Sequence, residues 1–120
     1  ITIIDNNDPI TNGLEDFDLK KTEQYYMLID PNIKVLAISE FEKENYEKPG
    51  KHENKITGST MPVVWKKNYG KGRIFYSSIG HHLTEFKVPE VMTMQMRGFR
   101  WASEGKYSEI EQTITPVYSK

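Results

Sequence analysis

The sequence predicts an α/β or α+β layer domain. Runs rich in β-branched and aromatic residues at 61–67 and 73–79 indicate strands, and one amphipathic helix is expected over 89–103. The predicted strands do not alternate regularly with helices, so a complete parallel sheet is not expected. The chain has 120 residues, and single domains typically have about 100–150. We therefore expect one domain or part of one.

The first half of the chain has two strand predictions separated by turns. Ile1–Ile4 is β-branched and runs into the turn-forming Asp5–Pro9. A second turn is expected at Ile10–Leu14, where Asn-Gly tolerates positive φ angles. A short strand is then expected at Phe17–Leu19.

Two apolar runs follow, Glu23–Ile29 and Lys34–Ser39, separated by Asp30-Pro31-Asn32. They predict either two adjacent strands or a helical turn that feeds a strand. Glu40–Lys55 is long and polar, with Pro49-Gly50 in its middle, and is interpreted as a mobile surface loop.

The strands Met61–Lys67 and Arg73–Ile79 flank Asn68–Gly72, whose two glycines favour a tight turn, so a β-hairpin is predicted. Apolar residues occur on both faces of these strands, which indicates a sheet that is covered on both sides.

The helix is predicted to begin at Pro89, which suits a first helical turn, and to stop at Gly105. An apolar stripe on this helix is predicted to pack into the core. Its members are Val91, Met92, Met96, Phe99 and Ala102.

The charge is nearly balanced, with 16 Lys and Arg against 17 Asp and Glu. Nucleic-acid-binding domains usually carry a basic patch, whereas here lysines alternate with acids in Glu42–Lys48. Nucleic-acid binding is therefore not expected. No apolar run approaches the roughly 18 residues that a membrane span needs, so no span is expected.

The chain has no cysteine, which excludes a disulfide, a thiolate nucleophile and a Cys-ligated metal within it. This composition is compatible with a cytoplasmic or a periplasmic domain. The first residue is Ile1 rather than Met, so we expect a piece of a longer protein.

Two stretches in the first half resemble the ThuA-like (trehalose utilisation) family. Asn7–Leu14 (NDPITNGL) is similar to the family's His-Pro-Ile-Thr-x-Gly-Leu turn, with Asp8 where a His is common. Thr22–Tyr26 (TEQYY) is similar to its Asp-Glu-x-Tyr segment, with Thr22 in place of the Asp.

The second half carries the more specific resemblance to this family. Met61–His82 (MPVVWKKNYGKGRIFYSSIGHH) follows the family pattern almost without a break. Arg97–Ala102 (RGFRWA) is similar to the family's final helix. The resemblance as a whole covers about residues 7–103.

The resemblance implies a three-layer α/β fold, flavodoxin-like in outline and related to class I glutamine amidotransferases. In that fold, residues 1–105 are the C-terminal part of the domain and 106–120 are an extension. The missing N-terminal half would supply most of the parallel sheet. Because the hairpin and helix alone would expose a large apolar face, we expect that half, another chain or a second copy in a homo-oligomer to cover it.

His81 and His82 follow an apolar strand and Gly80. Open α/β sheets place ligands at the C-terminal ends of strands, and imidazole can act as an acid, a base or a metal ligand. Adjacent residues of an extended strand point to opposite sides, so one histidine is expected to face a cleft. Two turn histidines bonded to the backbone are the alternative. The resemblance implies the first interpretation, with the pair as catalytic candidates.

Glu23 and Tyr25 match the family's Glu-x-Tyr. By this resemblance Glu23 is a candidate general base or a ligand for sugar hydroxyls, although an exposed Glu at a strand start is the alternative. A divalent ion such as zinc is compatible with imidazole and carboxylate ligands, but no third ligand is evident.

Trp65 and Tyr69 are candidates for an aromatic platform under a sugar ring, with plain core packing as the alternative for Trp65. Arg73 borders the hairpin and is the remaining substrate-binding candidate beside Tyr25. No Gly-x-Ser-x-Gly elbow is present. Because a cysteine nucleophile is also missing, glutaminase activity is not expected.

Two functions remain open. The resemblance implies a protein of carbohydrate utilisation that acts on a small sugar, a disaccharide or its 3-keto form, through a His/Glu site. The alternative is a module that binds carbohydrate or assists assembly without catalysis, which the departures at Asp8 and Thr22 favour.

Overall fold

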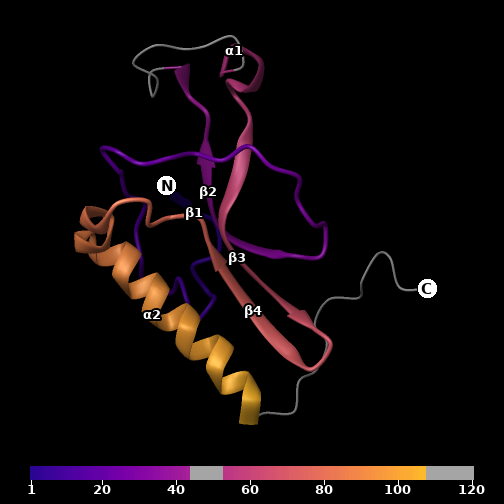
Figure 1. The fold of residues 1–120 in the computed structure, drawn as a ribbon. Helices are drawn as coiled ribbons and strands as arrows, with labels where there is room; N and C mark the ends of the chain where they lie inside the picture. Colours follow the sequence, from indigo (N-terminus) through magenta and orange to yellow (C-terminus); the bar gives the residue numbers. More distant parts are fainter. Residues whose placement is uncertain (44–52, 108–120) are drawn as a thin grey trace.

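The computed structural model describes residues 1–43 and 53–107. A four-stranded sheet has the order β1-β2-β3-β4, and each neighbouring pair is antiparallel (Figure 1). The strands are β1 (Thr2–Ile3), β2 (Lys34–Glu40), β3 (Thr60–Tyr69) and β4 (Gly72–Ser77). The sheet is accompanied by one long helix, α2 (Pro89–Glu104), an arrangement compatible with the predicted α/β fold.

The predicted hairpin is confirmed. Tyr69 pairs with Gly72, which leaves a two-residue turn in which Gly70 has a φ of +54°. Side chains alternate between the two faces of a strand. Trp65 pairs with Tyr76 on one face, and the neighbouring residues of both strands point to the other.

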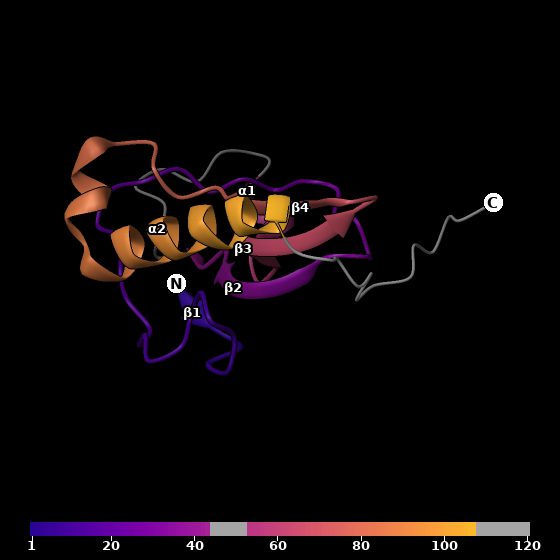
Figure 2. The ribbon, with the colours of Figure 1, turned by 90° about the horizontal axis from the view of Figure 1, so that it is seen from below.

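Helix α2 covers one face of the hairpin. Gly98 approaches β4 so closely that a Cβ there would lie 2.4 Å from the ring of Phe75. The ring of Phe99 meets the same ring edge-on, with a centroid distance of 6.1 Å. Viewed from below, α2 runs alongside β4 (Figure 2).

The connection between β1 and β2 crosses the sheet (Figure 1) and covers the opposite face of the hairpin. Trp65 and Tyr76 stack there with a centroid distance of 4.7 Å. Met27 places its sulfur 3.9 Å from the hydroxyl of Tyr76, and Asp30 pairs with Lys67. The second face of the hairpin is therefore covered by irregular chain rather than by a helix in the part that the structure describes.

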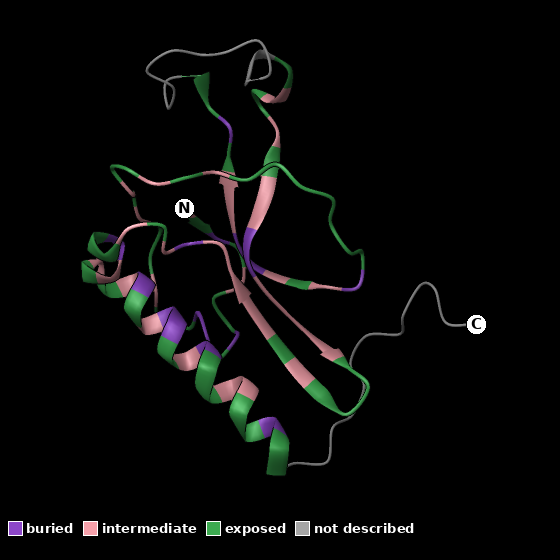
Figure 3. Cartoon of the chain, in the orientation of Figure 1, coloured by how far each residue is buried: buried purple, intermediate pink, exposed green. Residues whose placement is uncertain are grey.

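Helix α2 has almost the predicted span, and Val91 of the predicted stripe is buried, but most of that stripe is not on the buried side. The buried residues are Val91, Met94, Gln95 and Gly98. Met92, Met96 and Phe99 were predicted as core, yet they are 44–61% exposed (Figure 3). Gly98 explains the difference, because its missing side chain lets the helix approach the sheet on that side.

Two strand predictions in the β1–β2 connection are wrong. Phe17–Leu19 is irregular, although Phe17 and Ile1 exchange backbone hydrogen bonds of 3.1 and 2.7 Å. Glu23–Ile29 forms neither a strand nor a helical turn. Its contact with β2 is made by a side chain, since Gln24 donates to the Ser39 hydroxyl at 2.6 Å.

The polar stretch 40–55 was predicted as a loop, but residues 44–52 of it lie outside the described residues. Its end forms a short helix, α1 (Glu53–Ile56). The predicted extension 106–120 is described only as far as Tyr107, where a 3-10 helix, η3 (Gly105–Tyr107), follows α2. Within the described parts of the chain, no helix is long and apolar enough to cross a membrane.

Candidate active site

Glu23 connects two of the residues that the sequence singled out. Its Oε2 atom accepts a hydrogen bond of 2.6 Å from the Tyr25 hydroxyl and lies 3.3 Å from Nδ1 of His81. The side chains of Glu23 and His81 are 49% and 39% exposed, so a ligand in solution can reach them. The irregular segment that carries Glu23 thus meets the turn that follows β4.

That turn also holds His82, whose ring lies 4.4 Å from the ring of His81 at an interplanar angle of 74°. The two imidazoles were predicted to point to opposite sides of a strand. They contact each other instead, because β4 ends at Ser77 and the histidines lie beyond it.

Glu85 is a second acidic residue of this region and is only 4% exposed. It lies in the 3-10 helix η2 (Leu83–Lys87), and its carboxylate accepts hydrogen bonds from the backbone N–H groups of Gly80 at 2.9 Å and His82 at 3.0 Å. Burial, the strongest single influence, acts to raise the pKa of Glu85, but these two bonds, the neighbouring Thr22 hydroxyl and the nearby His82 together lower it. The Thr22 hydroxyl is buried beside this carboxylate, but within the described residues it forms no hydrogen bond of good geometry.

Sequence reasoning missed Glu85. A signal was present, because His82 and Glu85 have the spacing of a capping box, in which the third residue of a helix bonds back to the cap.

Tyr25 is held by the carboxylate of Glu23. Its hydrogen bond to Glu23 raises the pKa of Tyr25, since removing the phenolic proton would place two negative charges side by side. Tyr76 and Glu85 lie near enough to add to this effect.

A groove of about 810 Å³ lies beside this cluster, between the segment around residues 16–24 and the sheet. Its polar lining includes carboxylates and hydroxyls: Asp16, Asp18, Thr22, Glu23, Ser39, Glu40 and Ser78. Glu23 therefore belongs both to the groove and to the contact with His81. Such a lining offers many hydrogen-bonding groups to a polar ligand.

The remaining predicted site residues lie in three different places. Trp65 stacks on Tyr76 on the face that Met27 covers. Tyr69 is 73% exposed at the tip of the hairpin. Arg73 lies on the helix side, where its guanidinium donates to the carbonyl of Trp101 at 3.1 Å. The structure thus brings Glu23 close to the histidines but leaves Tyr69 and Arg73 apart from them.

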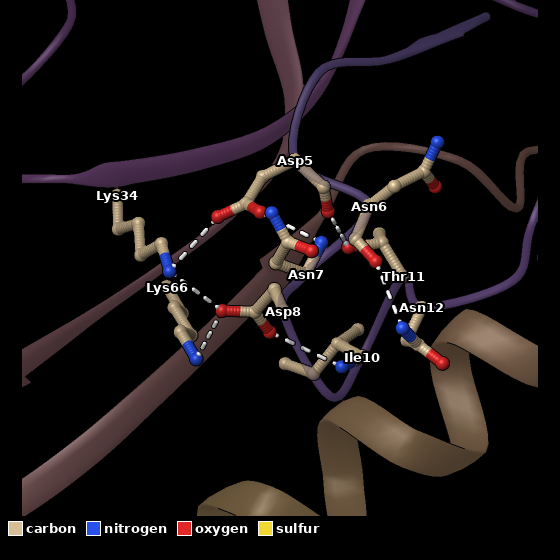
Figure 4. Close-up of polar contacts among 9 residues, drawn as sticks. All are labelled: Asp5, Asn6, Asn7, Asp8, Ile10, Thr11, Asn12, Lys34 and Lys66. Atoms are coloured by element: carbon tan, nitrogen blue, oxygen red, sulfur yellow. Dashed lines mark hydrogen bonds and ion pairs between the residues drawn. The ribbon is translucent and has the colours of Figure 1, made fainter.

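A second polar cluster lies in the loop after β1 (Figure 4). Asp8 has a side chain that is 1% exposed, and its Oδ2 lies 2.9 Å from Nζ of Lys34 and 2.6 Å from Nζ of Lys66. Its Oδ1 accepts the backbone N–H of Ile10 at 3.1 Å. Lys34 also pairs with Asp5 at 2.9 Å.

Burial is the strongest single influence on Asp8 and acts to raise its pKa. The hydrogen bonds from Lys66, Lys34 and the Ile10 N–H outweigh it, so the pKa of Asp8 is lowered. The sequence did not predict these lysine partners, because Lys34 and Lys66 are far from Asp8 along the chain.

A metal ion does not fit the described residues. No group of three or more His, Cys, Asp or Glu that could hold an ion occurs within residues 1–43 and 53–107, and zinc normally takes at least three protein ligands. Glu23 and His81 alone do not complete such a set, so no chemical step is assigned to an ion.

Fold and cluster together define an α/β protein with a carboxylate and an imidazole paired at the edge of a polar groove. The family model for ThuA, trehalose utilisation, matches residues 1–102, and the chain belongs to this family. No curated protein and no solved structure matches the chain.

Proposed function

We propose that this protein acts in disaccharide utilisation. In this proposal the Glu23–His81 pair removes the C2 proton of a 3-keto-sugar and returns it. The observation that carries the proposal is the 3.3 Å approach of His81 Nδ1 to Glu23 Oε2, with Glu23 lining the groove. Membership of the ThuA family, whose description is trehalose utilisation, supports a carbohydrate substrate.

The geometry supports a role for His81 as a base. When Nδ1 carries the ring proton and faces a carboxylate, Nε2 keeps its lone pair and can accept a proton from a substrate. In a 3-keto-sugar the hydrogen on C2 is acidified by the neighbouring carbonyl. His81 would take this proton, the C–H electron pair would form a C2=C3 double bond, and the carbonyl π pair would move to the oxygen as an enolate. The imidazolium would then return a proton to C2 as the carbonyl re-forms.

Sugar hydroxyls need hydrogen-bonding partners, and aromatic rings can pack on the apolar face of a sugar. Tyr25 and the polar groove lining supply the first, and Trp65 supplies an aromatic group on the same side of the sheet. Tyr69 and Arg73 lie apart from the Glu23–His81 pair and have no part in this proposal.

The test is exchange of the C2 hydrogen of a 3-keto-disaccharide with D₂O, followed by proton NMR. We expect exchange with the wild type and a loss of at least about 100-fold in His81→Ala, the usual size of a lost acid–base group. Leu83→Ala is the matched control, because Leu83 is 87% exposed and lies two residues from His81. Equal exchange rates in His81→Ala and the wild type would reject the proposal.

A non-catalytic sugar-binding or assembly module is the second candidate. It is favoured by Asp8, which stands where the family commonly has His and whose carboxylate is fully occupied by Lys34 and Lys66. Sugar binding by calorimetry without C2 exchange would support this candidate over the first.

We further propose that the chain completes a three-layer, amidotransferase-like domain with a further segment of a longer polypeptide or with another chain. The exposed stripe of Met92, Met96 and Phe99 on α2 supports this, because soluble proteins rarely leave contiguous apolar surface uncovered. A well-folded monomer of residues 1–120 in size-exclusion chromatography would contradict it. Phe99→Glu is expected to prevent this proposed assembly.

A further inference from the structure

We propose that Glu85 is a positioning residue that fixes the place and the tautomer of the His81 imidazole. This inference rests on the proposed function and deepens it, but it can be tested without a sugar.

Both carboxylate oxygens of Glu85 are used on the turn that carries His81. Oε2 accepts the N–H of Gly80 at 2.9 Å, and Oε1 accepts the N–H of His82 at 3.0 Å. These two amides flank His81 on either side. One buried side chain therefore holds the backbone of the turn before and after the histidine.

The neighbour of Glu85 holds the same turn by packing. Gly80 has a φ of +129°, a conformation that side chains rarely tolerate, and a Cβ there would lie 2.7 Å from the ring of Phe86. The turn thus fits against η2 through a hydrogen-bonded contact and a steric one. The backbone position of His81 is set by this helix rather than by β4.

The position of the turn decides which ring nitrogen faces Glu23. In the observed position Nδ1 of His81 lies 3.3 Å from Glu23 Oε2, so the tautomer with its proton on Nδ1 faces the carboxylate and leaves the Nε2 lone pair free. The charged or titratable groups near this ring include Glu23 and His82, whose ring lies 4.4 Å away. They also include Tyr25, which bonds to Glu23, and Glu85, which bonds to the turn. A small shift of the turn would separate Nδ1 from the carboxylate and remove the preference for one tautomer.

Glu85 is suited to this role because it stays ionised. The backbone hydrogen bonds keep its pKa below the ordinary value despite burial, and an ionised carboxylate has acceptors on both oxygens. It acts on His81 through the backbone and does not touch the ring, so it is not a catalytic residue.

The test compares ring nitrogen signals of His81 by NMR in the wild type and in Glu85→Gln at neutral pH, without a ligand. The amide keeps the shape of the side chain but turns a donor toward one of the two N–H groups, so one hydrogen bond is lost. We expect a single Nδ1–H tautomer in the wild type and a mixture of both tautomers in the variant. Glu15→Gln, at an exposed glutamate, is the control and should match the wild type.

A merely structural role for Glu85 would lower the melting temperature and leave the His81 tautomer unchanged. A folded Glu85→Gln protein with the wild-type His81 pattern overturns the inference. If Glu85→Gln does not fold, Glu85→Asp, which keeps the charge but shortens the reach, should show the mixed pattern. An unchanged pattern in Glu85→Asp also overturns the inference. Loss of the single tautomer in Glu85→Gln, combined with no exchange of the C2 hydrogen of the sugar by the wild type, would uphold this role and reject the proposed function.

Discussion

The Asp8 cluster and the Glu23 cluster differ in burial and in the use of their carboxylate oxygen atoms. Asp8 is 1% exposed and meets two lysines and a backbone N–H. Glu23 is 49% exposed and meets only Tyr25 and His81 within the described contacts. A buried charge with all its partners holds a loop to a sheet, whereas an exposed carboxylate beside an imidazole remains available to a ligand. The first cluster therefore stabilises the fold, and the second is the one proposed to bind a ligand.

The largest expected effect is on stability at the buried cluster. Asp8→Ala should lower the free energy of unfolding by about 3 kcal/mol, because Lys66 is then left largely buried without its carboxylate. Glu23→Ala should leave it nearly unchanged, since exposed ion pairs contribute little. Urea unfolding of both variants measures the difference, and equal losses would break the comparison.

A smaller loss is expected for Lys66→Met. Lys66 pairs with Asp8 and lies 4.7 Å from the centre of the Trp101 ring, but Lys34 still neutralises Asp8 when Lys66 is gone. We expect a loss of about 1–2 kcal/mol in the same unfolding experiment. Lys87→Met, at an exposed position, is the control. A loss as large as that of Asp8→Ala would show that Lys34 does not share the charge.

Lowering the pH should reduce the stability that the buried cluster contributes. The folded pKa of Asp8 is lowered from its ordinary 3.8, so the ionised form is favoured in the folded state. Its contribution to stability is therefore complete above that value and is lost as the pH falls through the lower, folded pKa. Asp8→Asn removes this part of the pH dependence, which thermal melts across the acidic range can measure. An unchanged acid profile in Asp8→Asn would contradict the assignment.

The smallest expected effect is a change in the pKa of Tyr25 in the exposed cluster. Glu23→Gln removes the negative charge that raises the pKa of Tyr25, so this tyrosine should titrate at a lower pH in the variant. NMR with labelled tyrosine rings follows the change for each residue. Tyr69, which is 73% exposed at the hairpin tip and lies apart from Glu23, serves as the internal reference. An unchanged Tyr25 titration would show that its hydroxyl does not depend on Glu23.

The hairpin strands β3 and β4 and the helix α2 were predictable because the sequence patterns that indicate them are local. The hairpin and Pro89–Glu104 follow from β-branched runs, glycines and a proline within a few residues of one another. The segment Glu23–Ile29 has a strand-like composition but is irregular, and the side chain of Gln24 attaches it to β2. Composition alone does not reveal such an anchor.

The buried side of α2 could not be predicted, for a different reason. Two neighbouring sides of α2 are apolar, and periodicity alone selected the side with Met92, Met96 and Phe99. The side that packs is the one with Gly98, since only there can the helix approach Phe75. The close contact is a property of the sheet and helix together.

The candidate site was predictable in part. Glu23, His81 and His82 came from a resemblance to the family, and the structure adds the distances between them. Glu85 and the lysine partners of Asp8 were missed, because the first has a spacing typical of many helix caps and the second depend on contacts between distant parts of the chain.

The central claim is that ligand binding occurs at the exposed cluster, and thermal melts with a 3-keto-disaccharide test it most directly. We predict a rise in melting temperature for the wild type and for Lys34→Met, and no rise for His81→Ala. A rise in His81→Ala equal to that of the wild type would contradict the account.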